Sequence, residues 1–210
     1  MMVKVCGNTR RLDACLAAEF GADAVGFVFW PASRRFVAPE AARAIVCTLP
    51  PSLLAVGVFV NQTVAEVAAV ASQVPLGAIQ LHGEEAPEDF AGIGLPLIKA
   101  VWANEAAPAF SPASLPPDVL VLVDGAGRAH RGGAGMAADW SRAAAIAACR
   151  RTILAGGLTP ENVEAAVTAV RPYGVDVSSG VEEQPGIKNA ARLRRFIETA
   201  RRALTERGLS

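Results

Sequence analysis

"TILAGGLTPENVEAAVTAVRPYGVDVSSG" (residues 152–180) alternates between two kinds of segment. Its two ends, TILAG and GVDVSSG, begin with apolar and β-branched residues, which favour strands. Between them, apolar residues recur three and four positions apart, which is typical of a helix packed on one face. Thr159 and Pro160 are suited to the N-cap and first turn of that helix. The stretch therefore predicts a strand, a helix and a second strand in succession.

The same alternation runs through the whole chain. Eight strand-like runs cover residues 2–6, 23–29, 53–60, 76–81, 96–101, 118–124, 152–156 and 174–180. Most are continuous apolar runs, which indicates strands of a parallel sheet buried on both faces. Eight such units favour a closed (β/α)8 TIM barrel over an open doubly wound sheet. We predict an α/β fold with a single compact domain over residues 1–210.

Two segments depart from the regular pattern. Residues 103–117 are rich in proline, so the fifth helix is expected to be short or broken. Residues 125–138, GAGRAHRGGAGMAA, should form the longest loop, before a helix that starts near Asp139. A long loop in a tight domain usually has a function. At the end of the chain, residues 189–204 predict an amphipathic helix, with Leu193, Phe196, Ile197 and Leu204 on its apolar face.

Composition excludes several classes of protein. Apolar residues make up 52% of the 210 residues, and twenty basic side chains balance twenty acidic ones. This balance argues against a general binder of nucleic acid or of anionic membranes. No signal peptide or membrane-length apolar run is evident. The four scattered cysteines, without a C-x-x-C pair, indicate reduced thiols, with no disulfide framework or metal site. The sequence predicts a cytoplasmic protein.

Polar residues at the strand ends are the candidates for chemistry, because the active site of such a barrel lies where strands pass into the following loops. Cys6 ends the first strand, and it is either a small buried filler or a reagent. Asp124 ends the sixth, either as a turn former before glycine or as a half-desolvated carboxylate. His82 could bond its own loop, and Arg34 and Arg35 could be a solvated pair.

Glycine and serine follow the last two strands, at Gly156, Gly157, Ser179 and Gly180. Ordinary turns would explain them, but backbone N–H groups at neighbouring strand ends also suit a phosphate. A thiol and a carboxyl group acting on one phosphorylated small molecule would indicate proton transfer between carbon and oxygen.

Eight motifs, in order along nearly the whole chain, resemble the phosphoribosylanthranilate isomerase family of tryptophan biosynthesis. They are KVCGNT, GFVF…SRRFV, VGVFVN, QLHG, LVD…GGAGMAADW, LAGGLTPENV, GVDVSSGVE and PGIKN. The resemblance implies an Amadori rearrangement of a ribosyl aminoaldose to a ribulose aminoketose, without a cofactor. It implies that Cys6 is the general base, that Asp124 is the general acid and that Arg35 holds the anthranilate carboxylate.

The resemblance also implies the remaining site residues and the partners. Gln80, His82 and Asp176 match positions that line the substrate pocket. The phosphate would lie against Gly133, Gly135, Gly156, Gly157, Ser179 and Gly180. The expected partner is a small phosphosugar, with no nucleic acid or membrane, and the chain is expected to be a monomer or a homodimer.

One residue departs from the family pattern, and two other functions compete. Position 134 is alanine, where the family usually has threonine or serine. This change puts the packing of the loop or the affinity for substrate in doubt. The first rival is the related isomerase of histidine biosynthesis, which has aspartate in place of Cys6 and a second phosphate site. The other is an inactive phosphosugar-binding barrel, which would have no reason to keep both Cys6 and Asp124.

Overall fold

The structure, a computed structural model, describes residues 1–103, 111–125 and 139–207. Eight parallel strands form a closed barrel, in which each strand pairs with the next in sequence and the eighth pairs with the first. The strands are β1 (Met2–Val5), β2 (Ala24–Val28), β3 (Leu54–Phe59), β4 (Ala78–Leu81), β5 (Leu97–Trp102), β6 (Leu120–Asp124), β7 (Thr152–Leu154) and β8 (Gly174–Val177). The predicted (β/α)8 TIM barrel is confirmed.

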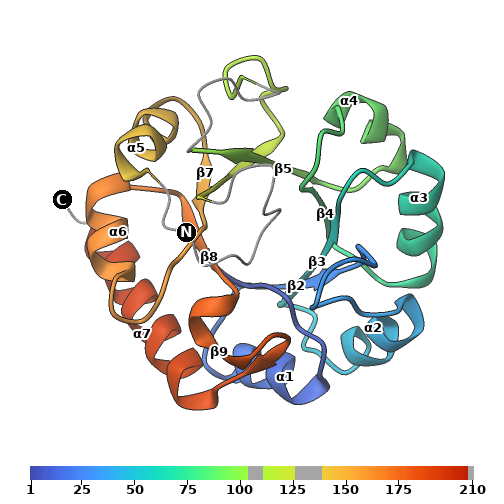
Figure 1. Cartoon of the computed structure of the whole chain (residues 1–210), viewed down its shortest axis with the longest axis horizontal. Helices are drawn as coiled ribbons and strands as arrows, with labels where there is room; N and C mark the ends of the chain where they lie inside the picture. The colour runs from blue at the N-terminus through green and yellow to red at the C-terminus, as the bar shows by residue number, and fades with distance from the viewer. Residues whose placement is uncertain (104–110, 126–138, 208–210) are drawn as a thin grey trace.

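Helices surround the barrel on its outside (Figure 1). They are α1 (Arg11–Glu19), α2 (Pro39–Val46), α3 (Val64–Gln73), α4 (Pro87–Phe90), the 3-10 turn η1 (Ala91–Ile93), α5 (Trp140–Cys149), α6 (Val163–Val170) and α7 (Ala190–Arg207). Between β5 and β6, the described residues 111–119 form turns and no helix, as their prolines predict. None of the described helices is long and apolar enough to cross a bilayer.

The chain after β8 differs from the sequence prediction. The strand ends at Val177, and a 3-10 turn, η3 (Ser179–Val181), follows it. Next comes a small antiparallel hairpin of β9 (Glu182–Gln184) and β10 (Ile187–Lys188), which we did not predict from the sequence. Gly186, at a φ of 84°, forms the turn of this hairpin. The hairpin brings charged side chains back toward β1.

The start of α6 is also later than predicted. The helix begins at Val163 with Asn162 as its N-cap, and Thr159 does not cap it. The reason is a preceding turn, in which the Thr159 carbonyl oxygen accepts hydrogen bonds from the N–H groups of Asn162 and Val163. The Asn162 side chain accepts a hydrogen bond from the Thr159 N–H and donates one to the Gly157 carbonyl oxygen. This turn fixes the backbone that follows β7.

Two apolar layers support the barrel. The outer layer lies between the strands and the helices and includes Leu193, Phe196, Ile197 and Leu204, the predicted apolar face of α7. The inner layer is made of small and medium side chains inside the barrel: Ala24, Val56, Ala78, Ile98, Ala100, Leu122, Ile153 and Ala155. Burial on both faces explains why the strands are continuous apolar runs.

Strand alternation positions the first candidate residue. Val3 and Val5 belong to the outer apolar layer, so Lys4 and Cys6 face the barrel interior. Cys6 follows the last residue of β1 and is 8% exposed. The sequence therefore delivers a thiol to the mouth of the barrel, above the apolar inner layer.

Candidate active site

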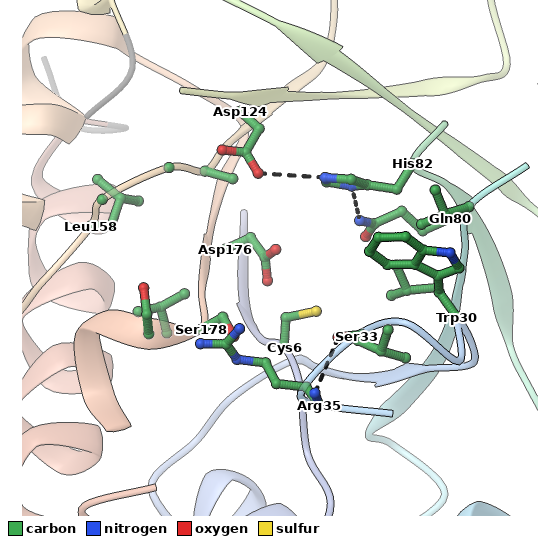
Figure 2. Close-up of a pocket in the computed structure, with 18 residues that line it drawn as sticks. Cys6, Trp30, Ser33, Arg35, Gln80, His82, Asp124, Leu158, Asp176 and Ser178 are labelled. Atoms are coloured by element: carbon green, nitrogen blue, oxygen red, sulfur yellow. Dashed lines mark hydrogen bonds and ion pairs between the residues drawn. The ribbon is translucent and has the colours of Figure 1, made fainter. Parts of the chain in front are cut away.

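A pocket opens at the carboxyl ends of the strands. Most of the predicted site residues line it: Cys6, Arg35, Gln80, His82, Asp124, Gly156, Gly157, Asp176 and Ser179. Gly180 lies next to this lining, and the predicted residues Gly133 and Gly135, together with Ala134, fall outside the described residues. Figure 2 shows Cys6 and Asp124 on opposite sides of the pocket, with Asp176 between them.

The side chains of Asp124, His82 and Gln80 form a row of polar contacts between the end of β6 and the end of β4. His82 Nε2 lies 3.5 Å from Asp124 Oδ2, and Gln80 Nε2 lies 2.9 Å from His82 Nδ1. An amide N–H can only donate, so the contact with Gln80 places the imidazole proton on Nε2, facing the carboxylate. All three residues are at most 6% exposed. The orientation of the Asp124 carboxylate is therefore supported by the side chains that follow β4.

Several buried polar atoms that line the pocket are not hydrogen-bonded to any part of the chain that the structure describes. Within the described residues, Gln80 Oε1, His82 Nε2 and Ser178 Oγ make no hydrogen bond. Buried polar atoms are nearly always hydrogen-bonded, so unpaired ones that line a pocket indicate a polar ligand. Ser178 was not predicted from the sequence, although it adjoins the predicted Ser179.

Lys4 and Asp176 form a buried ion pair below Cys6. Lys4 Nζ lies 3.0 Å from Asp176 Oδ1, and the lysine side chain is fully buried. Although burial opposes it, the Asp176 and Cys6 side chains together raise the pKa of Lys4, so its ammonium stays charged. Burial raises the pKa of the Cys6 thiol, and the Lys4 ammonium is the largest influence in the other direction.

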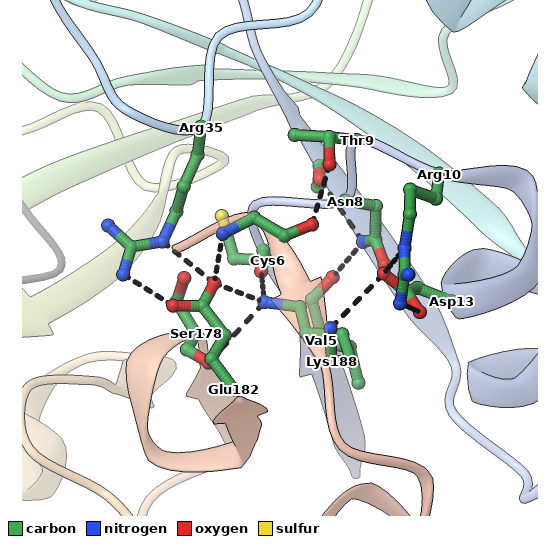
Figure 3. A network of polar contacts seen from close by, with 12 residues as sticks. Val5, Cys6, Asn8, Thr9, Arg10, Asp13, Arg35, Ser178, Glu182 and Lys188 are labelled. Atoms are coloured by element: carbon green, nitrogen blue, oxygen red, sulfur yellow. Dashed lines mark hydrogen bonds and ion pairs between the residues drawn. The ribbon is translucent and has the colours of Figure 1, made fainter. Parts of the chain in front are cut away.

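Arg35 belongs to a second ionic network, shown in Figure 3. Its Nε and Nη2 donate to the two carboxylate oxygens of Glu182, at 2.8 and 2.6 Å. Lys188 Nζ donates to Glu182 Oε1 at 2.9 Å and to the Cys6 carbonyl oxygen at 2.6 Å. The hydrogen bonds that Arg35 donates to Glu182 raise the pKa of Arg35. The network joins the loop after β2, the end of β1 and the hairpin that follows β8.

The two arginines of the SRRFV motif have different environments. Arg34 is exposed, whereas the Arg35 side chain is 12% exposed and lines the pocket. Within the described residues, Arg35 Nη1 makes no hydrogen bond, so this group remains for a ligand. The residue pattern alone did not separate the two arginines, and only the resemblance to the family selected Arg35. Glu182 and Lys188 were missed because their contacts depend on the path of the unpredicted hairpin.

Backbone geometry at the ends of β7 and β8 suits an anion. Gly156 and Gly157 have φ angles of 84° and 64°, a region that favours glycine. Within the described residues, the N–H groups of Gly156, Gly157, Ser179 and Gly180 make no hydrogen bond. A side chain on Gly156 would meet Asp124 Oδ1 at 2.8 Å, and one on Gly180 would overlap the Leu158 carbonyl oxygen. The lack of a side chain at Gly156 and Gly180 therefore allows close packing, and the backbone N–H groups remain available to an anion.

An apolar wall lies on one side of the thiol. Val28 and Val58 pack with Cys6, and Trp30 is packed against this cluster. Trp30 comes from the loop after β2 and was not predicted as a site residue. No group of three or more metal-ligating side chains occurs in the described residues. The pocket combines a carboxyl group, a thiol, an apolar surface and backbone N–H groups that make no hydrogen bond within the described residues.

The whole chain is similar to known isomerases. The family model for N-(5'-phosphoribosyl)anthranilate (PRA) isomerase matches residues 3–199. The chain belongs to the PRA isomerase family. The N-(5'-phosphoribosyl)anthranilate isomerase of Pelobacter propionicus is 45% identical to it over 204 residues, which cover 97% of each chain. Membership makes this chain an isomerase.

Two solved PRA isomerases share the fold closely. One is a complex with reduced 1-(o-carboxyphenylamino)-1-deoxyribulose 5-phosphate; it is 42% identical, with a TM-score of 0.83, over 96% of this chain and 98% of its own. The other is a monomer generated from the dimeric PRA isomerase of Thermotoga maritima. It is 39% identical, with a TM-score of 0.82, over 96% of this chain and 98% of its own.

Proposed function

We propose that this chain converts N-(5'-phosphoribosyl)anthranilate to 1-(o-carboxyphenylamino)-1-deoxyribulose 5-phosphate, with Cys6 as general base and Asp124 as general acid. The observation that supports it best is the placement of a thiol and a carboxyl group on opposite sides of one pocket (Figure 2). The ligand of the solved family complex is a reduced form of this product. That complex supports a small molecule as the partner of this chain, in keeping with the predicted phosphosugar. The relatives also agree with the prediction that this chain is a monomer or a homodimer.

The proposed reaction moves two protons between the protein and the sugar. Asp124 protonates the furanose ring oxygen, the bond from C1′ to that oxygen breaks, and the anilino nitrogen supplies the electron pair of a Schiff base. The Cys6 thiolate then removes the C2′ proton. The electron pair of the broken C2′–H bond forms the C1′–C2′ double bond, and the iminium nitrogen becomes neutral. The resulting enolamine tautomerises to the ketone. One acid and one base on opposite sides of the sugar suffice for these two proton transfers.

Gln80, His82 and Asp176 are proposed to contact the sugar. Gln80 Oε1 and His82 Nε2 make no hydrogen bond to the described part of the chain, and they offer an acceptor and a donor between the acid and the apolar wall. Asp176 lies between the acid and the base. The aromatic ring of the substrate would rest on the wall formed by Val28, Val58 and Trp30.

The direct test is to mix the purified protein with phosphoribosylanthranilate and follow the loss of its fluorescence. Catalysed loss supports the proposal. A phosphosugar-binding barrel without activity would bind the compound and leave its fluorescence unchanged. An isomerase specific for the doubly phosphorylated substrate of histidine biosynthesis would turn over that compound and not this one. Either of these two results would contradict the proposed function.

Arg35 is proposed to bind the anthranilate carboxylate through Nη1, while Glu182 holds the other side of the guanidinium. Arg35→Met should therefore raise KM about ten- to a hundred-fold, the loss of roughly 1.5–3 kcal/mol from one charged hydrogen bond, with a smaller change in kcat. Arg34→Met is the matched control, because its side chain is exposed. Equal KM values in the two variants would mean that other groups hold the carboxylate.

The phosphate is proposed to bind the N–H groups of Gly156, Gly157, Ser179 and Gly180, whereas the predicted contacts with Gly133 and Gly135 lie outside the described residues. Inorganic phosphate should then inhibit competitively, and crystals grown with sulfate should show the anion beside these residues. Ser179→Asp should raise both the inhibition constant for phosphate and KM by about tenfold or more, because like charges repel strongly in a half-buried site.

Ser72→Asp provides the control for this charge change, because Ser72 is exposed on α3. A substitution at Gly180 would be a poor probe, since any side chain there overlaps the Leu158 carbonyl oxygen and disturbs the packing. Unchanged phosphate inhibition in Ser179→Asp, or an anion bound at the other end of the barrel, would overturn the phosphate site.

A further inference from the structure

The barrel interior contains one ammonium group that the proposed proton transfers do not use. Lys4 is fully buried above an inner layer made only of apolar side chains, and it pairs with Asp176 at 3.0 Å. Removing two charges from water costs free energy that their attraction often fails to recover. A buried ion pair is therefore weak evidence for stability, and its place beside a proposed base points to a functional role.

Lys4 and Cys6 lie on the same side of the first strand, two residues apart. Gly26, on the neighbouring strand, leaves the space that both side chains occupy. A Cβ atom at Gly26 would lie 2.8 Å from Cys6 Sγ and 3.2 Å from Lys4 Nζ. The sulfur and the ammonium thus border one small gap, away from water, where a charge interaction is strong.

We infer that Lys4 is the positioning residue that makes Cys6 a base: its ammonium stabilises the thiolate, and Asp176 holds the ammonium in place. This inference rests on the proposed function of Cys6. In the reaction, the C2′–H bond breaks and an S–H bond forms, while Lys4 keeps all three of its protons. The cation therefore acts on the free enzyme by favouring the charged form of the sulfur before the substrate proton is removed.

The other charged groups near Cys6 are less suited to this role. Lys188 points its ammonium at the Cys6 carbonyl oxygen and at Glu182 Oε1. Arg35 makes its two-point contact with the same glutamate. The Asp176 carboxylate opposes ionisation of the thiol, and burial does so more strongly. Among the cations, Lys4 has the largest effect in lowering the pKa of Cys6.

The test measures the reactivity of Cys6 without substrate. Wild type and Lys4→Gln are treated with iodoacetamide over a range of pH, and mass spectrometry follows the peptide that contains Cys6. The glutamine amide can still donate to Asp176, but the charge is lost. We expect alkylation of Cys6 near pH 8 to slow about tenfold or more, because loss of the neighbouring cation raises the pKa of the thiol and leaves less thiolate to react. The exposed Cys47 serves as the internal control in every sample.

Lys99→Gln is the matched variant. Lys99 is equally buried and pairs with Glu85 at 3.3 Å, but it lies on the opposite face of the sheet from Cys6. The Lys99→Gln substitution should leave the alkylation rate of Cys6 unchanged. If Lys4→Gln does not fold, the double variant Lys4→Met, Asp176→Asn removes both charges and should show a smaller slowing in the same direction. An alkylation profile equal to that of wild type in a folded Lys4 variant would overturn the inference.

Kinetics separate this inference from the proposed function. Lys4→Gln should lower kcat more than it changes KM, and the rise of kcat/KM with pH should move to higher pH, because the base must be deprotonated. If Cys6→Ala kept its turnover, the role of Cys6 itself would be wrong. If Cys6→Ala were inactive while Lys4→Gln kept both the wild-type alkylation and pH profile, only the role of Lys4 would be wrong.

Discussion

Cys6→Ala should lose nearly all turnover while its KM stays close to the wild-type value. A general base typically contributes about a hundred- to ten-thousand-fold to the rate, and an alanine has no group that can accept the C2′ proton. The contacts proposed for binding come from other residues, among them Arg35 and Ser179. The measurement is kcat and KM from the loss of phosphoribosylanthranilate fluorescence, with enough enzyme to detect a ten-thousandth of the normal rate.

The fold of this variant should be intact, because the change removes one sulfur atom from a residue next to the pocket. Thermal unfolding of the variant checks this point. Cys47→Ala is the matched control, since it removes an exposed thiol and should leave turnover unchanged. Retention of more than about a tenth of the wild-type rate by Cys6→Ala would rule out the general-base role, given that expected contribution.

The barrel could be predicted because its strands are buried on both faces. In β2, for example, all five residues are buried, so the sequence shows an apolar run where a half-exposed strand would alternate. Local boundaries were harder to predict. Threonine is a preferred N-cap residue, yet the carbonyl oxygen of Thr159 closes a turn and the helix starts four residues later. Backbone hydrogen bonds of that kind leave no clear pattern in the sequence.

The candidate site was predictable where it depends on topology. Since the carboxyl ends of parallel strands meet at one mouth, Cys6, His82 and Asp124 had to lie near one another. Contacts made by loops were not predictable in this way. The pairing of Arg35 with Glu182 joins residues 147 positions apart and depends on how the hairpin after β8 folds back.

Lys4 shows a third case, in which the signal was present in the sequence. It lies two residues before Cys6 in a strand, so alternation places both side chains on one face. A lysine in an otherwise apolar strand that faces the barrel interior must be buried, and a buried ammonium needs an anionic partner. What the sequence did not contain was the identity of that partner, Asp176, at the end of the chain's eighth strand.

Asp124→Asn should lose turnover to a similar extent, by about a hundred-fold or more. Asparagine keeps the shape of the side chain but has no proton that it can transfer to the ring oxygen. The amide can still contact the imidazole of His82, which lies 3.5 Å from Oδ2 in the wild type, so the surrounding chain through Gln80 should be preserved. The loss should therefore appear in kcat, while KM and thermal stability change little.

Asp118→Asn is the control for this substitution. Asp118 is exposed and lies just before β6, at the opposite end of the strand from Asp124, so the same chemical change there should not affect turnover. Normal turnover by Asp124→Asn would show that another group protonates the ring oxygen. His82 would then be the next candidate, because its Nε2 faces the same part of the pocket and has no hydrogen bond within the described residues. In that case His82→Gln should abolish the activity that Asp124→Asn retains.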